Sequence, residues 1–364
     1  MLINKSKKMV VNMKPIHKSC LTVALAALIP SLSYADATLY GSFRLGMFKT
    51  DDRSAVLDDY ASRIGIRGTV DLGLENTKGI FNWEQGLSLN TGALGGGRYA
   101  HVGAKGDWGT LMGGKFDHPT YAYVGNVNEF AMSALPTGLD VGYVANGSDP
   151  RTGFRADRRV SNSIGYISPN LNGLEAMVVG VFAGETSGNV FAGPASTQKD
   201  NEIDGYNLGV KYTLQNLTLA TAYGAVKSGK DAQGVYGVDA HLWGVAARYR
   251  LNNFRFAAKY EQSKDKVRNL TDKGYALNAG YELNGYGASV GFATTKQDQA
   301  DRERSTSVEL HRRLGNAVIA IGYVNYNDAA VSNTNSYKQY NDERALFPIV
   351  GGNDTAYLTY RLQF

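Results

Sequence analysis

The sequence predicts an all-β protein, a transmembrane, antiparallel, up-and-down β-barrel of sixteen strands. Three observations lead to this prediction. Apolar and polar residues alternate along short segments, short turns alternate with longer polar loops, and aromatic residues gather beside the short turns. After residue 35 the sequence contains no run of about 18 consecutive apolar residues, the minimum for a membrane-spanning helix.

Residues 1–35 have the composition of a cleaved export signal. Five lysines precede the apolar run from Cys20 to Pro30, and Ser33 and Ala35 provide the small residues of a cleavage site before Asp36. We therefore expect a signal peptide over 1–35 and a barrel domain over 36–364. A retained membrane anchor or a plain N-terminal helix is the alternative interpretation.

Charge and cysteine content narrow the class of protein further. The five lysines of the signal account for the whole formal net charge of +5, so the remaining chain is formally neutral and offers no basis for a nucleic-acid surface. Cys20, the single cysteine, also lies in the signal. Since an exported chain without disulfides must be held together in another way, this favours an extensive hydrogen-bonded framework over a small disulfide-rich fold.

The alternation is clearest between residues 243 and 261. Trp243, Val245 and Tyr249 share one face, whereas Arg248 and Arg250 lie on the other. A soluble β-sandwich has the same period, so the period alone does not decide between the two folds. The position of the aromatic residues favours a membrane barrel, because an interfacial aromatic girdle lies beside the short turns. These residues are Tyr212, Tyr249, Phe254, Tyr281 and Tyr286.

Turns and loops give the strand count in order along the chain. Short turns are predicted near 71–78, 106–109, 169–173, 215–216, 252–253, 284–285 and 315–316. Longer polar loops are predicted near 49–59, 90–97, 117–157, 184–204, 226–240, 262–274, 295–303 and 327–352. Seven turns and eight loops in alternation make sixteen strands with both ends on the short-turn side, the plan of a bacterial outer-membrane barrel.

The last segment, AYLTYRLQF, has an apolar ladder from Ala356 to Phe364. An open sheet edge is excluded from the hydrocarbon core because every backbone group there must be paired. We therefore expect this strand to close onto the first one, ATLYGSFRLGMF.

Arginines on the predicted strands should face the lumen, because an arginine that faces lipid at the bilayer midplane costs about 2–4 kcal/mol. Arg44 alternates with apolar neighbours, Arg63 and Arg67 alternate with Ile64 and Ile66, Arg98 begins a predicted strand, and Arg159 alternates with Val160. Rim positions or side chains that reach to the interface are the alternative for some of them.

Four segments spread over the chain after residue 35 resemble landmarks of the general porins of Gram-negative bacteria. They are LYGSFRLG, SRIGIRGTVDLG, RYAHVGAKGDWGTLMGGKF and RRVSNSIGYISPNLNG, and the terminal aromatic residue adds to them. The resemblance implies a trimeric, sixteen-stranded outer-membrane channel with a long third loop folded inward. It places Arg63, Arg98 and Arg159 in the basic wall of the constriction, and Arg44 one inward position beyond the usual first-strand cation.

The 41-residue loop from Asp117 to Asp157 corresponds to that inward loop. By the resemblance its acids face the arginines, and Glu129 and Asp140 are the candidates. An ordinary external loop is the alternative. With Arg44, Arg63, Arg67, Arg98 and Arg159 on the opposite wall, the expected mechanism is passive diffusion of small hydrophilic solutes and ions.

The family also implies a homotrimer, contact with outer-membrane lipids and lipopolysaccharide, and insertion by the barrel-assembly machinery. We expect no enzyme, cofactor or metal site, because His101, His118, His241 and His311 lack metal-ligand spacing and no HExxH, Walker or dinucleotide motif occurs. An adhesin or receptor barrel without a conducting pore and a barrel hydrolase remain as alternatives.

Overall fold

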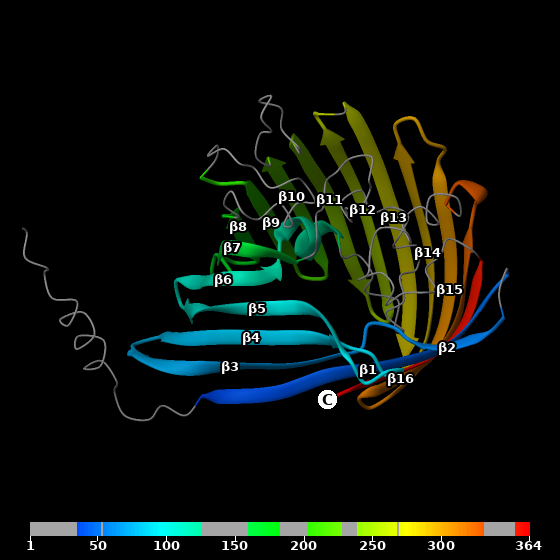
Figure 1. Ribbon diagram of the computed structural model, residues 1–364, viewed down its shortest axis with the longest axis horizontal. Helices are drawn as coiled ribbons and strands as arrows, with labels where there is room; N and C mark the ends of the chain where they lie inside the picture. Colours follow the sequence, from blue (N-terminus) through cyan, green and yellow to red (C-terminus); the bar gives the residue numbers. More distant parts are fainter. Residues whose placement is uncertain are drawn as a thin grey trace, which may run out of the picture.

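The chain folds into one antiparallel sheet that curves round and closes on itself (Figure 1). The computed structural model describes residues 35–51, 54–125, 159–182, 202–227, 239–267, 269–330 and 354–364. The strands are β1 (Asp36–Thr50), β2 (Val56–Asp59), β3 (Arg63–Leu74), β4 (Thr77–Leu87), β5 (Leu94–Gly106), β6 (Gly109–Asp117), β7 (Arg159–Ile167), β8 (Leu174–Val181), β9 (Gly205–Leu214), β10 (Leu217–Lys227), β11 (Asp239–Leu251), β12 (Phe254–Asp265), β13 (Leu270–Leu283), β14 (Tyr286–Gln297), β15 (Glu303–Leu314), β16 (Ala317–Tyr326) and β17 (Thr355–Gln363). A π-type helix, η1 (Thr120–Gly125), follows β6.

The barrel has sixteen strands, as predicted, because β2 and β3 form two parts of one strand. Both pair with β1, β2 along residues 45–48 and β3 along residues 36–42. Between them the chain leaves the ladder at Tyr60–Ser62, where Ala61 has a left-handed φ of 60°. The last strand, β17, pairs with β16 on one side and with β1 on the other, which closes the barrel.

The seven short turns lie where the sequence predicts them. Six of them join their strands through two residues each, and the β7–β8 turn spans residues 168–173. Asn76, Asn252 and Asn284 occupy turn positions with φ of 54°, 52° and 51°. Asparagine tolerates this left-handed conformation, and such turns match the twist of the strands they join.

Three predicted loops are shorter than the sequence indicated. Residues 56–59 pair as β2 within the predicted loop 49–59, and β5 already begins at Leu94. The predicted loop 262–274 shrinks as well, because β12 runs to Asp265 and β13 begins at Leu270. The polar residues that suggested a loop there belong largely to the strand ends, where Ser263, Asp265 and Asp272 are buried.

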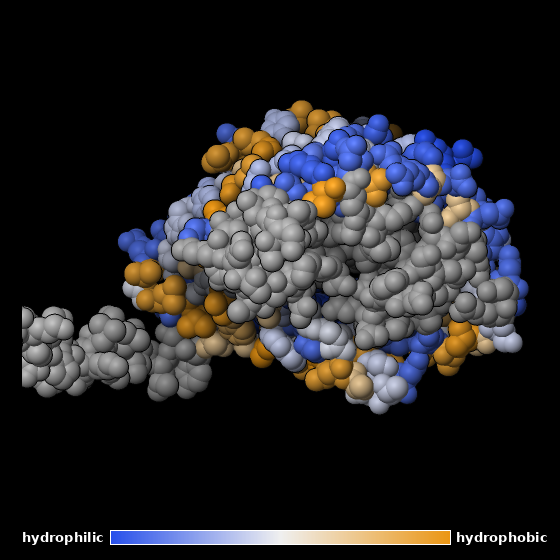
Figure 2. All heavy atoms as spheres, turned by 45° about the horizontal axis from the view of Figure 1, so that its top comes forward, coloured by the Kyte–Doolittle hydropathy of each residue, from blue (hydrophilic) through white to orange (hydrophobic). Residues whose placement is uncertain are grey.

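The two faces of the wall have opposite character. Along β15, Glu303, Ser305 and Glu309 are buried inside the barrel, whereas Val308 and Leu310 are exposed on the outside. Figure 2 shows hydrophobic residues on the outer wall and hydrophilic residues gathered along the upper right of the view, over the ends of β12–β15. The apolar face therefore looks outward, as a bilayer requires, and the ionic face surrounds the lumen.

The predicted aromatic girdle lies on the outer face next to the short turns. The exposed fractions of Tyr212, Tyr249, Phe254, Tyr281 and Tyr286 range from 36% to 63%. Phe254 and Tyr281, on neighbouring strands, also contact each other with ring centroids 4.7 Å apart and ring planes tilted by 58°. Their exposure beside the turns places them at the level of the membrane interface.

The terminal Phe364 takes part in barrel closure. Its backbone exchanges two hydrogen bonds with Gly41, of 2.9 and 3.2 Å, and its ring packs edge-on against Phe43 with centroids 5.1 Å apart. A Cβ atom at Gly41 would lie 2.4 Å from the Phe364 ring, so a side chain at this position would displace the ring. Among the described residues no helix is long and apolar enough to cross a membrane.

Candidate functional site

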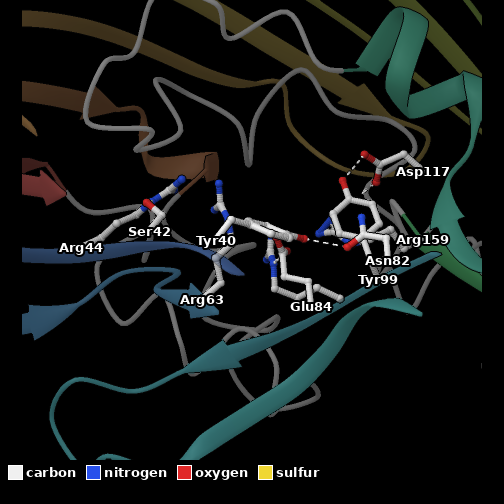
Figure 3. A network of polar contacts seen from close by, with 10 residues as sticks. Tyr40, Ser42, Arg44, Arg63, Asn82, Glu84, Tyr99, Asp117 and Arg159 are labelled. Atoms are coloured by element: carbon white, nitrogen blue, oxygen red, sulfur yellow. Dashed lines mark hydrogen bonds and ion pairs between the residues drawn. The ribbon is translucent and has the colours of Figure 1, made fainter. Parts of the chain in front are cut away.

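A row of arginines lines the inner face of the wall from β1 to β7 (Figure 3). Arg63 lies opposite the inward Ser42 of β1, and Arg44 follows Ser42 on the same face of β1. Coulombic repulsion acts on Arg63 from Arg98 and Arg159 and on Arg44 from Arg63, so these four guanidinium groups share one stretch of wall.

Arg67 also faces inward but belongs less closely to this row. It lies nearer the short-turn end of β3, opposite Asn82 of β4, and it is exposed. Its guanidinium carbon is 4.8 Å from the centroid of the Tyr40 ring, a cation–π contact. Tyr40 in turn donates a 2.8 Å hydrogen bond to the Asn82 side chain.

The wall itself supplies an acid that the sequence analysis missed. Glu84 on β4 is 3% exposed, pairs with Arg63 at 3.5 Å and forms an ion pair with Arg98. Its neighbour Trp83 is exposed on the outer face. The same alternation that assigned the arginines would have placed Glu84 in the lumen.

A second acid, Asp117, stands where β6 ends. It accepts a 2.6 Å hydrogen bond from the Tyr99 hydroxyl and forms a 3.3 Å ion pair with Arg159. The Arg159 guanidinium also lies over the Tyr99 ring, 4.9 Å from its centroid. Arg159 is thereby held on both sides, by a carboxylate and by an aromatic face.

Residues 118–125, which we call the stem, lead from β6 into the barrel and include η1. The stem packs against β9, β10, β11 and β12. Arg248 donates to the Tyr123 carbonyl at 3.0 Å, and the buried Lys259, paired with Glu261 at 2.8 Å, donates to the Gly125 carbonyl at 3.2 Å. The first part of the predicted inward loop thus lies within the lumen.

The candidate loop acids Glu129 and Asp140 fall in 126–158, outside the described residues, as does the signal segment 1–34. The structure therefore brings Arg44, Arg63, Arg98 and Arg159 together and leaves the acidic side of the predicted constriction untested. In the described ranges no group of three or more His, Cys, Asp or Glu side chains is arranged to hold a metal ion.

Glycines on three neighbouring strands make room for the stem. A Cβ atom at Gly209 on β9 would lie 2.4 Å from Pro119, and one at Gly244 on β11 would lie 2.7 Å from Val124. A Cβ atom at Gly224 on β10 would lie 3.1 Å from Thr120 and 2.7 Å from the Asn207 side chain. These glycines leave the inner wall without side chains at three positions where the stem packs against it. The sequence analysis did not find this feature.

His118 fixes the start of the stem. Its ring nitrogens contact the Ser163 hydroxyl at 3.1 Å and the Asn207 amide at 3.2 Å, and its carbonyl accepts hydrogen bonds from the backbone of Tyr121 and Ala122. Burial lowers the pKa of His118 from 6.5 to about 4. The folded protein therefore holds this imidazole neutral at neutral pH.

We expect acid to loosen this anchor. Because the pKa of His118 is lower in the folded state than in the unfolded one, its contribution is complete above pH 6.5 and declines as the pH falls towards 4, by at most about 1.4 kcal/mol per unit. Thermal denaturation at pH 7 and pH 5 measures this, and His118→Gln should lose less stability over that interval than the wild type. An equal loss in both proteins would contradict the assignment.

A closed barrel of sixteen strands with an apolar outside, a charged inside and a loop stem in its lumen defines a β-barrel protein of the Gram-negative outer membrane. The sequence profile of the family described as Gram-negative porin matches residues 21–329. The chain belongs to this family.

Known proteins agree with that membership. The chain is 24% identical over 354 residues to the major outer membrane protein P.IA of Neisseria meningitidis serogroup B, which covers 83% of this chain and 82% of that protein. It is 34% identical over 128 residues to the P.IB protein of Neisseria gonorrhoeae, a match that covers 31% of this chain and spans only 36% of that relative's length. In fold it is similar to the anion-selective porin from Comamonas acidovorans, with a TM-score of 0.68, 18% identity, and coverage of 91% of this chain and 100% of that one.

Proposed function

We propose that the protein is a water-filled outer-membrane channel for the passive diffusion of small hydrophilic solutes and ions. The observation that carries this proposal is the inner wall, where Arg44, Arg63, Arg98 and Arg159 line the lumen on strands β1 to β7, whereas the helix of the stem packs against β9 to β12. An inner face of this charge suits a hydrated pore and would be costly in a dry core. Family membership supports the same function.

The constriction is proposed to lie between this arginine row and the loop that the stem begins. Glu129 and Asp140 are its proposed acids. Two unit charges 4 Å apart interact by about 1 kcal/mol in bulk water and by about 4 kcal/mol at an effective dielectric constant of 20. A field of that size orients dipolar solutes and favours one sign of ion without holding either tightly.

The assembly and export of the chain are proposals of the same kind. They comprise a homotrimer, cleavage of residues 1–35, insertion by the barrel-assembly machinery, and contact with lipids and lipopolysaccharide. The family membership and the outward apolar wall support them.

Planar-bilayer recordings test the channel directly. The purified protein should produce stepwise currents in chloride salts, in groups of three if it is a trimer. A pure, folded protein that carries no current would reject the proposal and favour a role as an adhesin or receptor.

Selectivity tests the arginine row. Arg63→Ala and Arg159→Ala each remove a positive charge from the lumen, so the reversal potential in a salt gradient should move towards cation preference. Arg304 is a matched control, because it is exposed on the outer face of β15. Arg304→Ala should leave the reversal potential unchanged, and the same result for both lumen variants would remove the constriction assignment.

A further inference from the structure

Two arginines meet at the seam where the first and last strands close the barrel. Arg44 on β1 lies directly opposite Arg361 on β17, and both lie on the inner face. Arg44 is only 6% exposed and Arg361 is half-buried. Like charges directly opposite in a sheet repel each other, so this pairing needs a compensating group.

No carboxylate of the described residues forms a close ion pair with either guanidinium group, although the buried Glu309 attracts Arg361 at longer range. The Nε of Arg44 donates a 3.0 Å hydrogen bond to the Ser42 hydroxyl, and the Nε of Arg361 is buried without an acceptor. Of the nearby acids, Glu84 pairs with Arg63 and Arg98, and Glu309 accepts a 2.9 Å hydrogen bond from Tyr357.

The break between β2 and β3 adds a third donor. Its backbone is fixed to β1, because the Tyr60 amide donates to the Arg44 carbonyl at 3.2 Å and the Arg44 amide donates to the Ser62 hydroxyl at 2.8 Å. Tyr60 is fully buried with its ring edge-on to Phe48, and its hydroxyl lies near Thr359 without a hydrogen bond of normal geometry. Coulombic interaction couples Tyr60 to both Arg44 and Arg361.

These three side chains, which we call the seam cluster, share one chemical property. Each presents a donor, and two of them carry a positive charge. A buried charge without a partner is costly, and the cost falls when an anion binds with several acceptor oxygens. The planar fork of arginine matches carboxylate and phosphate groups in particular, whereas water accepts a hydrogen bond without balancing the charge.

We propose that Arg44, Arg361 and Tyr60 form a binding site for an oxyanion group, carboxylate or phosphate, carried by solutes that enter the lumen. This proposal rests on the proposed channel function in one respect, because solutes must be able to enter the lumen to reach the site. It lies on the closing seam, with donors that Glu84 does not neutralise. An anion held there would have a longer residence time than chloride.

Calorimetric titration of the folded, full-length protein in detergent tests the site without any current. Inorganic phosphate and acetate serve as separate probes, and the one that binds more tightly identifies the preferred group. Arg361→Gln should weaken binding about tenfold, since it removes one charged donor. Tyr60→Phe should weaken it several-fold, because it removes the hydroxyl donor and keeps the ring that packs against Phe48.

Arg304→Gln, on the outer face, is the matched control and should bind the anions like the wild type. Absence of binding in the wild type, or equal affinity in the wild type, Arg361→Gln and Tyr60→Phe, would overturn the site. Bilayer currents in chloride separate the two proposals. A conducting protein that does not bind these anions would refute the seam site alone, whereas binding without any current would refute the channel alone.

Discussion

Replacing Glu84 with Gln is expected to move the ion selectivity strongly towards anions and to destabilise the barrel. Glu84 is 3% exposed and pairs with both Arg63 and Arg98, so its loss leaves two partly buried guanidinium groups without their shared carboxylate. Breaking a buried ion pair from one side costs about 3 kcal/mol or more. The reversal potential in a salt gradient and the thermal unfolding temperature are the two measurements.

Two further variants give this prediction its control. Glu75 lies exposed in the β3–β4 turn, so Glu75→Gln removes the same charge away from the arginine row and should change neither quantity. Adding Arg63→Gln to Glu84→Gln removes one of the stranded charges and should recover part of the lost stability. If Glu84→Gln behaved like Glu75→Gln, the carboxylate would have no part in the field of the lumen.

Much of the fold was predictable from local sequence because a membrane barrel has strong local rules. Each strand must turn one apolar face to lipid and pair on both edges, so alternation and turn residues determine the strand number and the face of each residue. The inward positions of Arg44 and Arg63 follow from this parity. Glu84 obeys the same rule, but the sequence argument applied it only to arginines.

Features that depend on residues far apart in the chain were not predictable in this way. The opposition of Arg44 and Arg361 arises only when the first and last strands meet. The break at Ala61 becomes visible only once both β2 and β3 are seen to pair with β1. The stem likewise packs with Pro119 against Gly209, which lies ninety residues later in the chain. A single sequence shows a glycine on a strand but not which segment lies over it. For Glu129 and Asp140 the prediction stands as it was made.

The close contact between Gly209 and the stem leads to the second large effect, which we expect from Gly209→Ala. The new methyl group would lie 2.4 Å from the Pro119 ring and 2.8 Å from the Tyr123 ring, and a strand on one side and a proline on the other leave little freedom to relax. Overpacking of this kind costs about 1–3 kcal/mol, and it falls on contacts of the folded stem. The displaced stem should therefore become roughly tenfold or more populated than in the wild type.

A displaced stem has two observable consequences. It loses the hydrogen bond from Thr120 to Asn207 at 2.8 Å and the one from Arg248 to the Tyr123 carbonyl, so single-channel currents should show more frequent transitions and protease should cleave the stem faster. Gly113→Ala is the matched control, because its methyl group would meet nothing nearer than 3.9 Å. If Gly209→Ala showed no more current transitions and no faster cleavage than the wild type, the position of the stem in the lumen would not depend on the glycine at 209.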